Sequence, residues 1–238
     1  MSPRTTVDLK AKALAVHKRL CVEYGAPIPF FHDLDPLSEI VSSLLSHRTR
    51  NADSGRAFKQ LRATYPTWEQ VRDAPTTAVE AAVAACTWPE QKAPRIQHIL
   101  RKIELLRGDL SLDFLADLAV VEARAWLEDH PGIGPKTSAA VLLFSRLRMP
   151  ALPVDSHHHR VAQRLGLIGP KVEVGPSHAI LEAQLPPGWT SQQVYDNHES
   201  LMLHGPEGLF PARAEMREMC GAGFMPVRTV AVGGRALR

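Results

Sequence analysis

Apolar residues recur along the chain at spacings of three and four, which is the period of an α-helix with one buried face. Alternation of apolar and polar residues over more than four positions is nearly absent, so no strand is predicted. The first apolar stripe ends before Gly25, a residue type that commonly terminates helices, and consists of Leu9, Ala13, Val16 and Leu20. The pattern therefore predicts an all-α protein.

The same periodicity predicts a series of further helices joined by short polar turns. Pro36 opens the second helix, whose apolar stripe in PLSEIVSSLLS runs into the polar cluster HRTRN. No clear periodicity remains past Met219. The other helices are expected at about residues 53–64, 67–73, 76–85, 91–107, 112–118, 120–129, 135–147, 156–165, 176–185 and 191–204.

The segment MPALPVD at residues 149–155 interrupts this series. Its two prolines, Pro150 and Pro153, disfavour helical backbone in the residues before them and so predict an extended crossing. We place a domain boundary here. The expected architecture is two helical domains with a cleft between them: a central helical barrel of residues 29–149, and a discontinuous second domain of residues 1–28 and 150–238.

Length and composition are those of an ordinary globular protein. The chain has 238 residues, 45% of them hydrophobic and 22% charged, so it can bury a core without disulfides. No apolar run reaches the roughly 18 to 20 residues of a membrane span, and the N-terminus lacks the apolar stretch of a signal peptide. We therefore expect a cytoplasmic protein, nucleoid-associated if bacterial, with no membrane partner.

The stretch HPGIGPKTSAAVLLF, residues 130–144, predicts two helices joined by a tight glycine turn. Gly132 and Gly134 allow close approach of a partner and direct amide N–H groups outward at a helix N-terminus, an arrangement that binds phosphate. For the glycines alone, a tight hairpin turn without a ligand is the alternative. Lys136 lies behind Pro135 in the first helical turn, where the helix dipole disfavours a cation and lowers the pKa of an amine. Lys136 is therefore a candidate nucleophile.

A second polar stretch, VDSHHHRV, contains Asp155, which lies nineteen positions after Lys136. Asp155 lies directly before a predicted helix, and this position alone identifies it as an N-cap. The same carboxylate can also stabilise positive charge developing on a sugar carbon, or orient a nucleophile. The adjacent histidines, His157 to His159, point in three directions along a helix, so no metal site is expected.

Together, HPGIGPKT and PVDSHHHRV resemble the helix-hairpin-helix Gly/Pro-Asp (HhH-GPD) superfamily of DNA glycosylases, most closely the endonuclease III branch. The family motif is L-P-G-V-G-x-K-T, followed about twenty residues later by V-D-T-H-x-x-R-V. On that pattern Lys136 takes the place of the catalytic lysine and Asp155 that of the catalytic aspartate. The resemblance extends to LLSHRTRNAD at 44–53, CTWPEQKAPRI at 86–96 and LMLHG at 201–205.

The resemblance also implies a set of DNA contacts. Trp88 lies in a turn that in the family wedges into the duplex, with an ordinary buried indole as the alternative. Arg48 stands where the family has the glutamine that fills the gap left by the flipped base, and Asn51 replaces an aspartate. The residues expected to contact DNA are Arg48, Trp88, Lys92, Gly132, Ile133, Gly134 and Thr137.

One departure from the family concerns its iron–sulfur cluster. Endonuclease III usually carries a loop C-x6-C-x2-C-x5-C that holds a [4Fe–4S] cluster, whereas this chain reads HGPEGLFPARAEMREMCGAGF at that place. The only cysteines are Cys21, Cys86 and Cys220, with no paired spacing. We therefore expect no cluster and no other cofactor.

The function implied by the resemblance is excision of a damaged base from duplex DNA, followed by strand cleavage through a Schiff base on Lys136. Oxidised pyrimidines are the expected lesions, ahead of alkylated purines and 8-oxoguanine, and the expected partner is duplex DNA with a damaged base or abasic site, bound by a monomer. One alternative is a glycosylase without lyase activity, acting on alkylated or mismatched bases, in which water attacks under Asp155. The other is a non-catalytic DNA-binding module.

Overall fold

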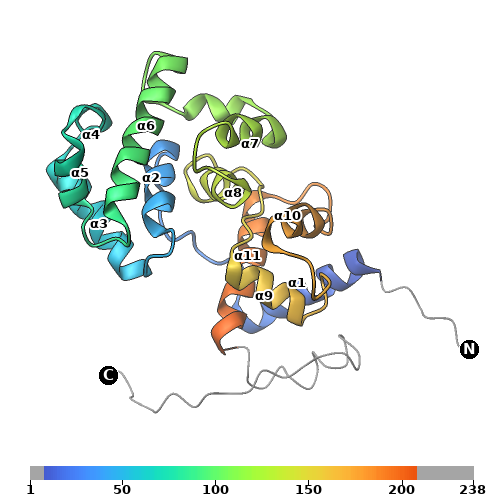
Figure 1. Cartoon of the computed structure of the whole chain (residues 1–238). Coiled ribbons are helices and arrows are strands. Elements are labelled where there is room, and N and C mark those ends of the chain that lie inside the picture. The colour runs from blue at the N-terminus through green and yellow to red at the C-terminus, as the bar shows by residue number, and fades with distance from the viewer. Residues whose placement is uncertain (1–7, 208–238) are drawn as a thin grey trace, which may run out of the picture.

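The computed structural model describes residues 8–207, and over this range the protein is helical without strands (Figure 1). The predicted all-α class is confirmed. The elements are α1 (Leu9–Tyr24), α2 (Pro36–Ser46), α3 (Asn51–Thr64), α4 (Trp68–Asp73), α5 (Thr76–Ala82), α6 (Pro89–Arg107), the 3-10 helix η1 (Asp113–Asp117), α7 (Val120–Glu128), α8 (Pro135–Phe144), α9 (Ser156–Arg164), α10 (Val174–Glu182) and α11 (Ser191–Glu207).

Local capping residues explain where several helices begin and end. The Asp8 carboxylate accepts hydrogen bonds from the first turn of α1, which ends at Gly25 with a positive φ of 81°. Asp35 caps α2 in the same way, directly before Pro36 at the first helical position. Thr67 and Gln70 form a reciprocal capping box at the start of α4. These are short-range signals that satisfy otherwise unpaired N–H groups.

Several predicted helices differ from the structure at their ends. The helices expected at 76–85 and 176–185 end at Ala82 and Glu182. The helix expected at 135–147 ends at Phe144, because Ser145 adopts an extended ψ of 173°. Further on, Arg148 has a positive φ of 48° and the Met149 N–H donates to the Leu142 carbonyl. Leu147 still packs against the core, so the apolar pattern continues past the end of the helix. The helix expected at 112–118 is the short 3-10 helix η1.

The buried apolar side chains form two clusters. The first is built mainly from α2 to α7, and the second from α1 and α9 to α11, so that α1 packs beside α11 (Figure 1). Helix α8 contributes to both: Ala139, Val141 and Leu142 face the first cluster, whereas Ala140, Leu143 and Phe144 face the second. Along the chain the change from one cluster to the other falls between Ala151 and Leu152. The domain division itself stays a prediction.

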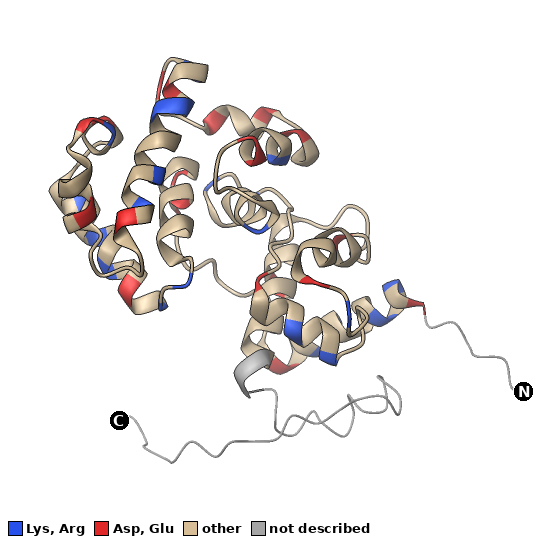
Figure 2. Ribbon diagram, in the orientation of Figure 1, with Lys and Arg blue, Asp and Glu red and all other residues tan. Residues whose placement is uncertain are grey.

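Charged residues of both signs are spread over both halves of the molecule (Figure 2). Within residues 8–207, no helix is long and apolar enough to cross a bilayer.

Candidate active site

Helices α7 and α8 form the predicted hairpin. The turn between them is anchored by the Ile133 side chain, which is buried in the first cluster. Ser138 Oγ donates to Glu128 Oε1 over 2.6 Å and ties the two helices together. The buried Ile133 side chain holds the turn, and the expected contact of this residue with DNA stays a prediction.

The two hairpin glycines differ in what the fold demands at their positions. Gly132 has a φ of 86°, and a Cβ on it would lie 2.7 Å from Cδ of Arg95, so the fold itself demands glycine there. Gly134, the N-cap of α8, has an ordinary φ of −107°, and no atom lies within 4 Å of the position of its Cβ. The chain's own fold does not require glycine at 134. Its bare surface leaves the uncapped N–H groups of α8 open to an anion.

Lys136 is half-buried in the first turn of α8. Burial lowers the pKa of its amine, and the nearby carboxylates of Asp155 and Glu39 oppose that shift. The direction agrees with the sequence argument. A lowered pKa increases the fraction of neutral, nucleophilic amine near neutral pH.

Asp155 is the N-cap of α9, as the sequence predicts. Its Oδ1 accepts the N–H groups of His157 and His158 over 2.9 and 2.8 Å. Within residues 8–207, Oδ2 accepts no hydrogen bond, so it is available to Lys136 or to a ligand. The capping role and a role in the site are therefore compatible.

His47 connects the loop after α2 to the hairpin. Its Nε2 lies 3.2 Å from Oγ1 of the buried Thr137. Burial, followed by the cations Lys136, Lys92 and Arg95, lowers the pKa of His47 to about 4, so the ring is neutral at neutral pH. Thr137 directs its side-chain hydroxyl toward His47. The expected contact of Thr137 with DNA stays a prediction.

The side chain of Lys92 on α6 is buried and fully hydrogen-bonded. It is 5% exposed, and its Nζ donates to the Leu45 carbonyl (2.7 Å), the His47 carbonyl (2.8 Å) and Thr49 Oγ1 (2.8 Å). These three bonds use all three ammonium protons. Lys92 thus holds the loop that carries Arg48, and its direct contact with DNA stays a prediction.

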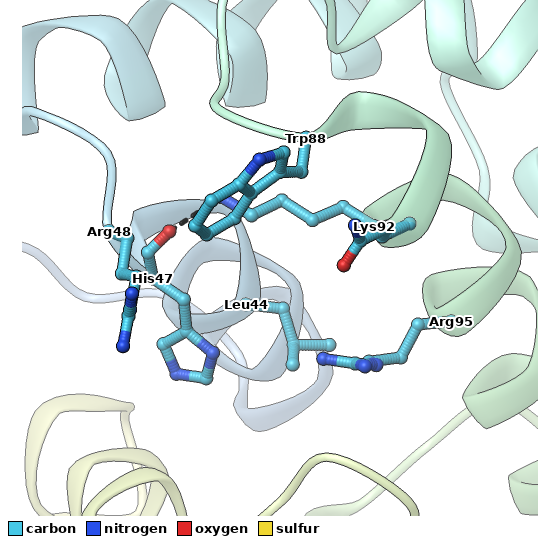
Figure 3. Close-up of a pocket in the computed structure, with 7 residues that line it drawn as sticks. Leu44, His47, Arg48, Trp88, Lys92 and Arg95 are labelled. Carbon is cyan, nitrogen blue, oxygen red and sulfur yellow. Dashed lines mark hydrogen bonds between the residues drawn. The ribbon is translucent and has the colours of Figure 1, made fainter.

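Arg48 and Trp88 both line a pocket of about 370 Å³ (Figure 3). Both adopt positive φ, 50° and 55°, a conformation that costs non-glycine residues about 1–3 kcal/mol and is common at functional sites. The guanidinium of Arg48 lies 5.8 Å from the centroid of the Trp88 ring. Trp88 is 44% exposed, so the buried-indole alternative is wrong. The pocket is lined by Leu44, His47, Arg48, Trp88, Gln91, Lys92 and Arg95.

Three residues near the site were missed or given a minor role by the sequence argument. His47 stands beside Arg48 in the motif already noted, and Arg95 lies seven residues after Trp88, on the same face of α6 two turns further along. His198 packs with its Nδ1 3.3 Å from that of His158, and it lies close enough to Lys136 and Asp155 for both charges to act on it.

Known proteins are similar to this chain in amino-acid sequence and in fold. An Arabidopsis thaliana protein with the provisional name DNA glycosylase is 34% identical over 169 residues, 71% of this chain and 56% of its own. Endonuclease III of Thermotoga maritima is 32% identical over 136 residues, 57% of this chain and 59% of its own. This chain thus spans less than two thirds of the length of these relatives. A structure of endonuclease III in a non-covalent complex with DNA shares the fold, with a TM-score of 0.69 at 20% identity, covering 83% of this chain and 86% of that one.

A family match covers more than half of the chain. Residues 41–187, which include α8, Lys136 and Asp155, match the family described as HhH-GPD superfamily base excision DNA repair protein. This range also contains the pocket residues Arg48 and Trp88. The chain belongs to the HhH-GPD superfamily of base excision DNA repair proteins.

Proposed function

We propose that this protein removes a damaged base from duplex DNA and then cleaves the strand at the resulting abasic site. The observation that carries this proposal is the pairing of Lys136, an amine with a lowered pKa, with the nearby carboxylate of Asp155. A non-catalytic DNA-binding protein needs the backbone amides of the hairpin, but it does not need a lysine and an aspartate placed near each other. Oxidised pyrimidines are the lesions we propose, and a monomer is the proposed active form.

The chemistry uses the neutral amine of Lys136. Its nitrogen attacks C1′ of the sugar, the bond from C1′ to the base breaks, and the base leaves with the electron pair and takes up a proton. One amine proton passes to the departing base, and the other passes to the ring oxygen as the bond from C1′ to that oxygen breaks, which gives a Schiff base. Removal of a proton from C2′ then expels the 3′ phosphate, and water releases the lysine. Asp155 stabilises the positive charge on the sugar during the first step.

Binding of the duplex is assigned to the hairpin and to the Arg48–Trp88 pocket. The uncapped N–H groups of α8 are suited to a phosphate. A base must leave the stack before its glycosidic bond can be reached, and the exposed Trp88 is placed to hold the duplex open. Arg48 stands beside it as the group that fills the space left by the base.

Borohydride trapping of the wild-type protein tests this proposal. Duplexes with one oxidised pyrimidine, one alkylated purine or one abasic site are incubated with the protein and borohydride. We expect a covalent complex on the abasic and oxidised-pyrimidine duplexes. Base release without trapping favours the alternative in which water attacks, and tight binding without release on any lesion favours the non-catalytic module.

Gly134→Leu should weaken binding to every duplex about equally. The side chain fits the fold, because the space around Cβ is open and φ is ordinary, but it covers the amides that we assign to a phosphate. Contacts to phosphate position a protein without reading sequence. Affinities of damaged and undamaged duplexes, measured over a range of salt concentrations, check this expectation.

Gly175→Leu is the matched control, since the Cβ position of this glycine on α10 is also open. It should leave the affinity unchanged. For the wild type, affinity should fall steeply with rising salt as counterions are released. A Gly134→Leu protein with altered lesion preference but intact affinity and salt dependence contradicts a phosphate role.

We also propose that the protein works without a [4Fe–4S] cluster. Such a cluster needs four thiolates. Cys21 is half-buried on α1, Cys86 is buried in the first cluster, and Cys220 lies outside the described residues. The cysteines of one chain therefore do not fit the cluster of the endonuclease III branch.

Purified protein should consequently be colourless. We expect no visible absorbance from iron–sulfur charge transfer and negligible iron after anaerobic reconstitution, measured by absorption spectroscopy and metal analysis. Cys220→Ser serves as the comparison. Stoichiometric iron that survives this substitution shows that other residues hold iron and overturns the proposal.

A further inference from the structure

Two buried histidines, His158 on α9 and His198 on α11, contact each other close to Asp155. Their Nδ1 atoms lie 3.3 Å apart, and the two rings stack with centroids 5.4 Å apart at an angle of 27°. His158 is 1% exposed and His198 is 5% exposed. Neither side chain takes part in the proposed chemistry. Burying two polar rings costs free energy, which their contact with each other offsets.

The pair holds the chain on both sides of Asp155. After Asp155, the backbone N–H of His158 donates to Asp155 Oδ1 over 2.8 Å, and the ring of the same residue contacts His198. Before Asp155, the backbone of Pro153 makes a hydrogen bond with the His198 ring. Proline has no N–H, so the Pro153 carbonyl accepts and the ring donates. His198 therefore ties together positions 153 and 158, and Asp155 lies between them.

The ring of His198 is itself firmly supported. It contacts the Phe144 ring of α8 at a centroid distance of 5.4 Å. Tyr195, three residues earlier on α11 and 1% exposed, meets Phe144 edge-on at 5.9 Å. Helices α9 and α11 pack against each other (Figure 1). Because these neighbours fix the ring before any substrate binds, holding it in place costs little further entropy during the reaction.

Both rings are neutral near neutral pH. Burial lowers the pKa of His198 to about 4, and burial also lowers the pKa of His158 well below its usual value. A cation at this place would cancel part of the negative charge on the Asp155 carboxylate. A neutral pair holds the carboxylate without weakening its charge. The other charged or titratable groups that act on the two rings are Lys136, His159 and His178.

We propose that His198 positions Asp155, with His158 as its link to α9. The inference rests on the proposed function, in which Asp155 stabilises positive charge on the sugar during base release. That stabilisation depends on where the carboxylate lies, and a misplacement of about 1 Å can cost about a hundredfold in rate. His198 acts through Asp155 and is a positioning residue.

Two substitutions separate the hydrogen bonds of His198 from its packing. His198→Phe keeps a flat ring against Phe144 but has no polar atom for His158 or Pro153. His198→Asn places a polar amide near the position of Nδ1 but gives up the ring. For each full-length protein, single-turnover base release is measured on the damaged base of the trapping panel that the wild type releases fastest. Borohydride trapping on a preformed abasic site and thermal unfolding are measured alongside.

His198→Phe should slow base release by about ten- to hundredfold, because Asp155 is no longer held in place. Trapping on the abasic site should slow much less, since its glycosidic bond is already broken. His198→Asn should retain more of the rate of base release, because its amide can replace the contact with His158. His17→Phe is the matched control and should match the wild type, since His17 is a buried histidine of α1 that packs on Trp189 at 4.4 Å.

A double-mutant cycle tests whether His198 acts through Asp155. His198→Phe should slow base release much less in the Asp155→Asn protein than in the wild type, because the carboxylate that it positions is already lost. Equal slowing in the two backgrounds indicates a general structural effect and overturns the inference. Thermal unfolding shows whether each variant is folded at the temperature of the assay.

Failure of this inference can be told apart from failure of the proposed function. Normal base release by His198→Phe overturns the positioning role alone, and so does slower release by His198→Asn than by His198→Phe. Wild-type protein that binds duplex but releases no base of the panel and traps on no abasic site overturns the proposed function and this inference with it.

Discussion

Lys136→Gln should abolish borohydride trapping on an abasic duplex while duplex binding is retained. Glutamine keeps most of the side-chain length but has no amine to form a Schiff base. The hairpin amides that we assign to phosphate binding belong to the backbone and stay in place. Gel analysis of the covalent complex and a binding measurement on the same duplex check both parts of this expectation.

The matched control is Lys59→Gln, at an exposed lysine of α3, which should trap like the wild type. The trapping rate of the wild type should also rise with pH and level off at a lower pH than an exposed amine permits. The neutral amine exists above its pKa, and burial lowers that pKa. Normal base release by Lys136→Gln with only strand cleavage lost supports the alternative in which water attacks.

Asp155→Asn should slow base release by about two to three powers of ten, since removing one preorganised electrostatic group typically costs about 3–4 kcal/mol of transition-state stabilisation. The fold should persist, because asparagine caps a helix as well as aspartate does. Cleavage of a preformed abasic site should slow much less, since the glycosidic bond is already broken. Single-turnover rates of the two steps provide the measurement.

Asp8→Asn tests whether the effect belongs to the site. Asp8 caps α1 through the same kind of contact, from its carboxylate to backbone N–H groups, so the change in charge and capping is matched. Its activity should equal that of the wild type. Equal slowing of base release and abasic cleavage by Asp155→Asn contradicts a specific role in the first step.

Much of the fold follows from signals that act over a few residues. Helix positions depend on apolar spacing and on caps such as Asp35 and Asp155, whose hydrogen bonds reach two or three residues along the chain. The hairpin is local as well, because the glycine turn and the N-terminus of α8 lie within one short stretch. Lys136 and Asp155 could therefore be singled out from the sequence by position and residue type.

The sequence by itself thus determined the helices, the hairpin and the two candidate catalytic residues. Only the tertiary structure decided what many other side chains do, because their partners lie far away along the chain. Lys92 donates a hydrogen bond to the carbonyl of Leu45, 47 positions earlier, and so supports a loop. His198 packs on His158, 40 positions earlier. Periodicity reports which face of a helix is buried, but burial and partner together determine whether a charge or a ring is free to act.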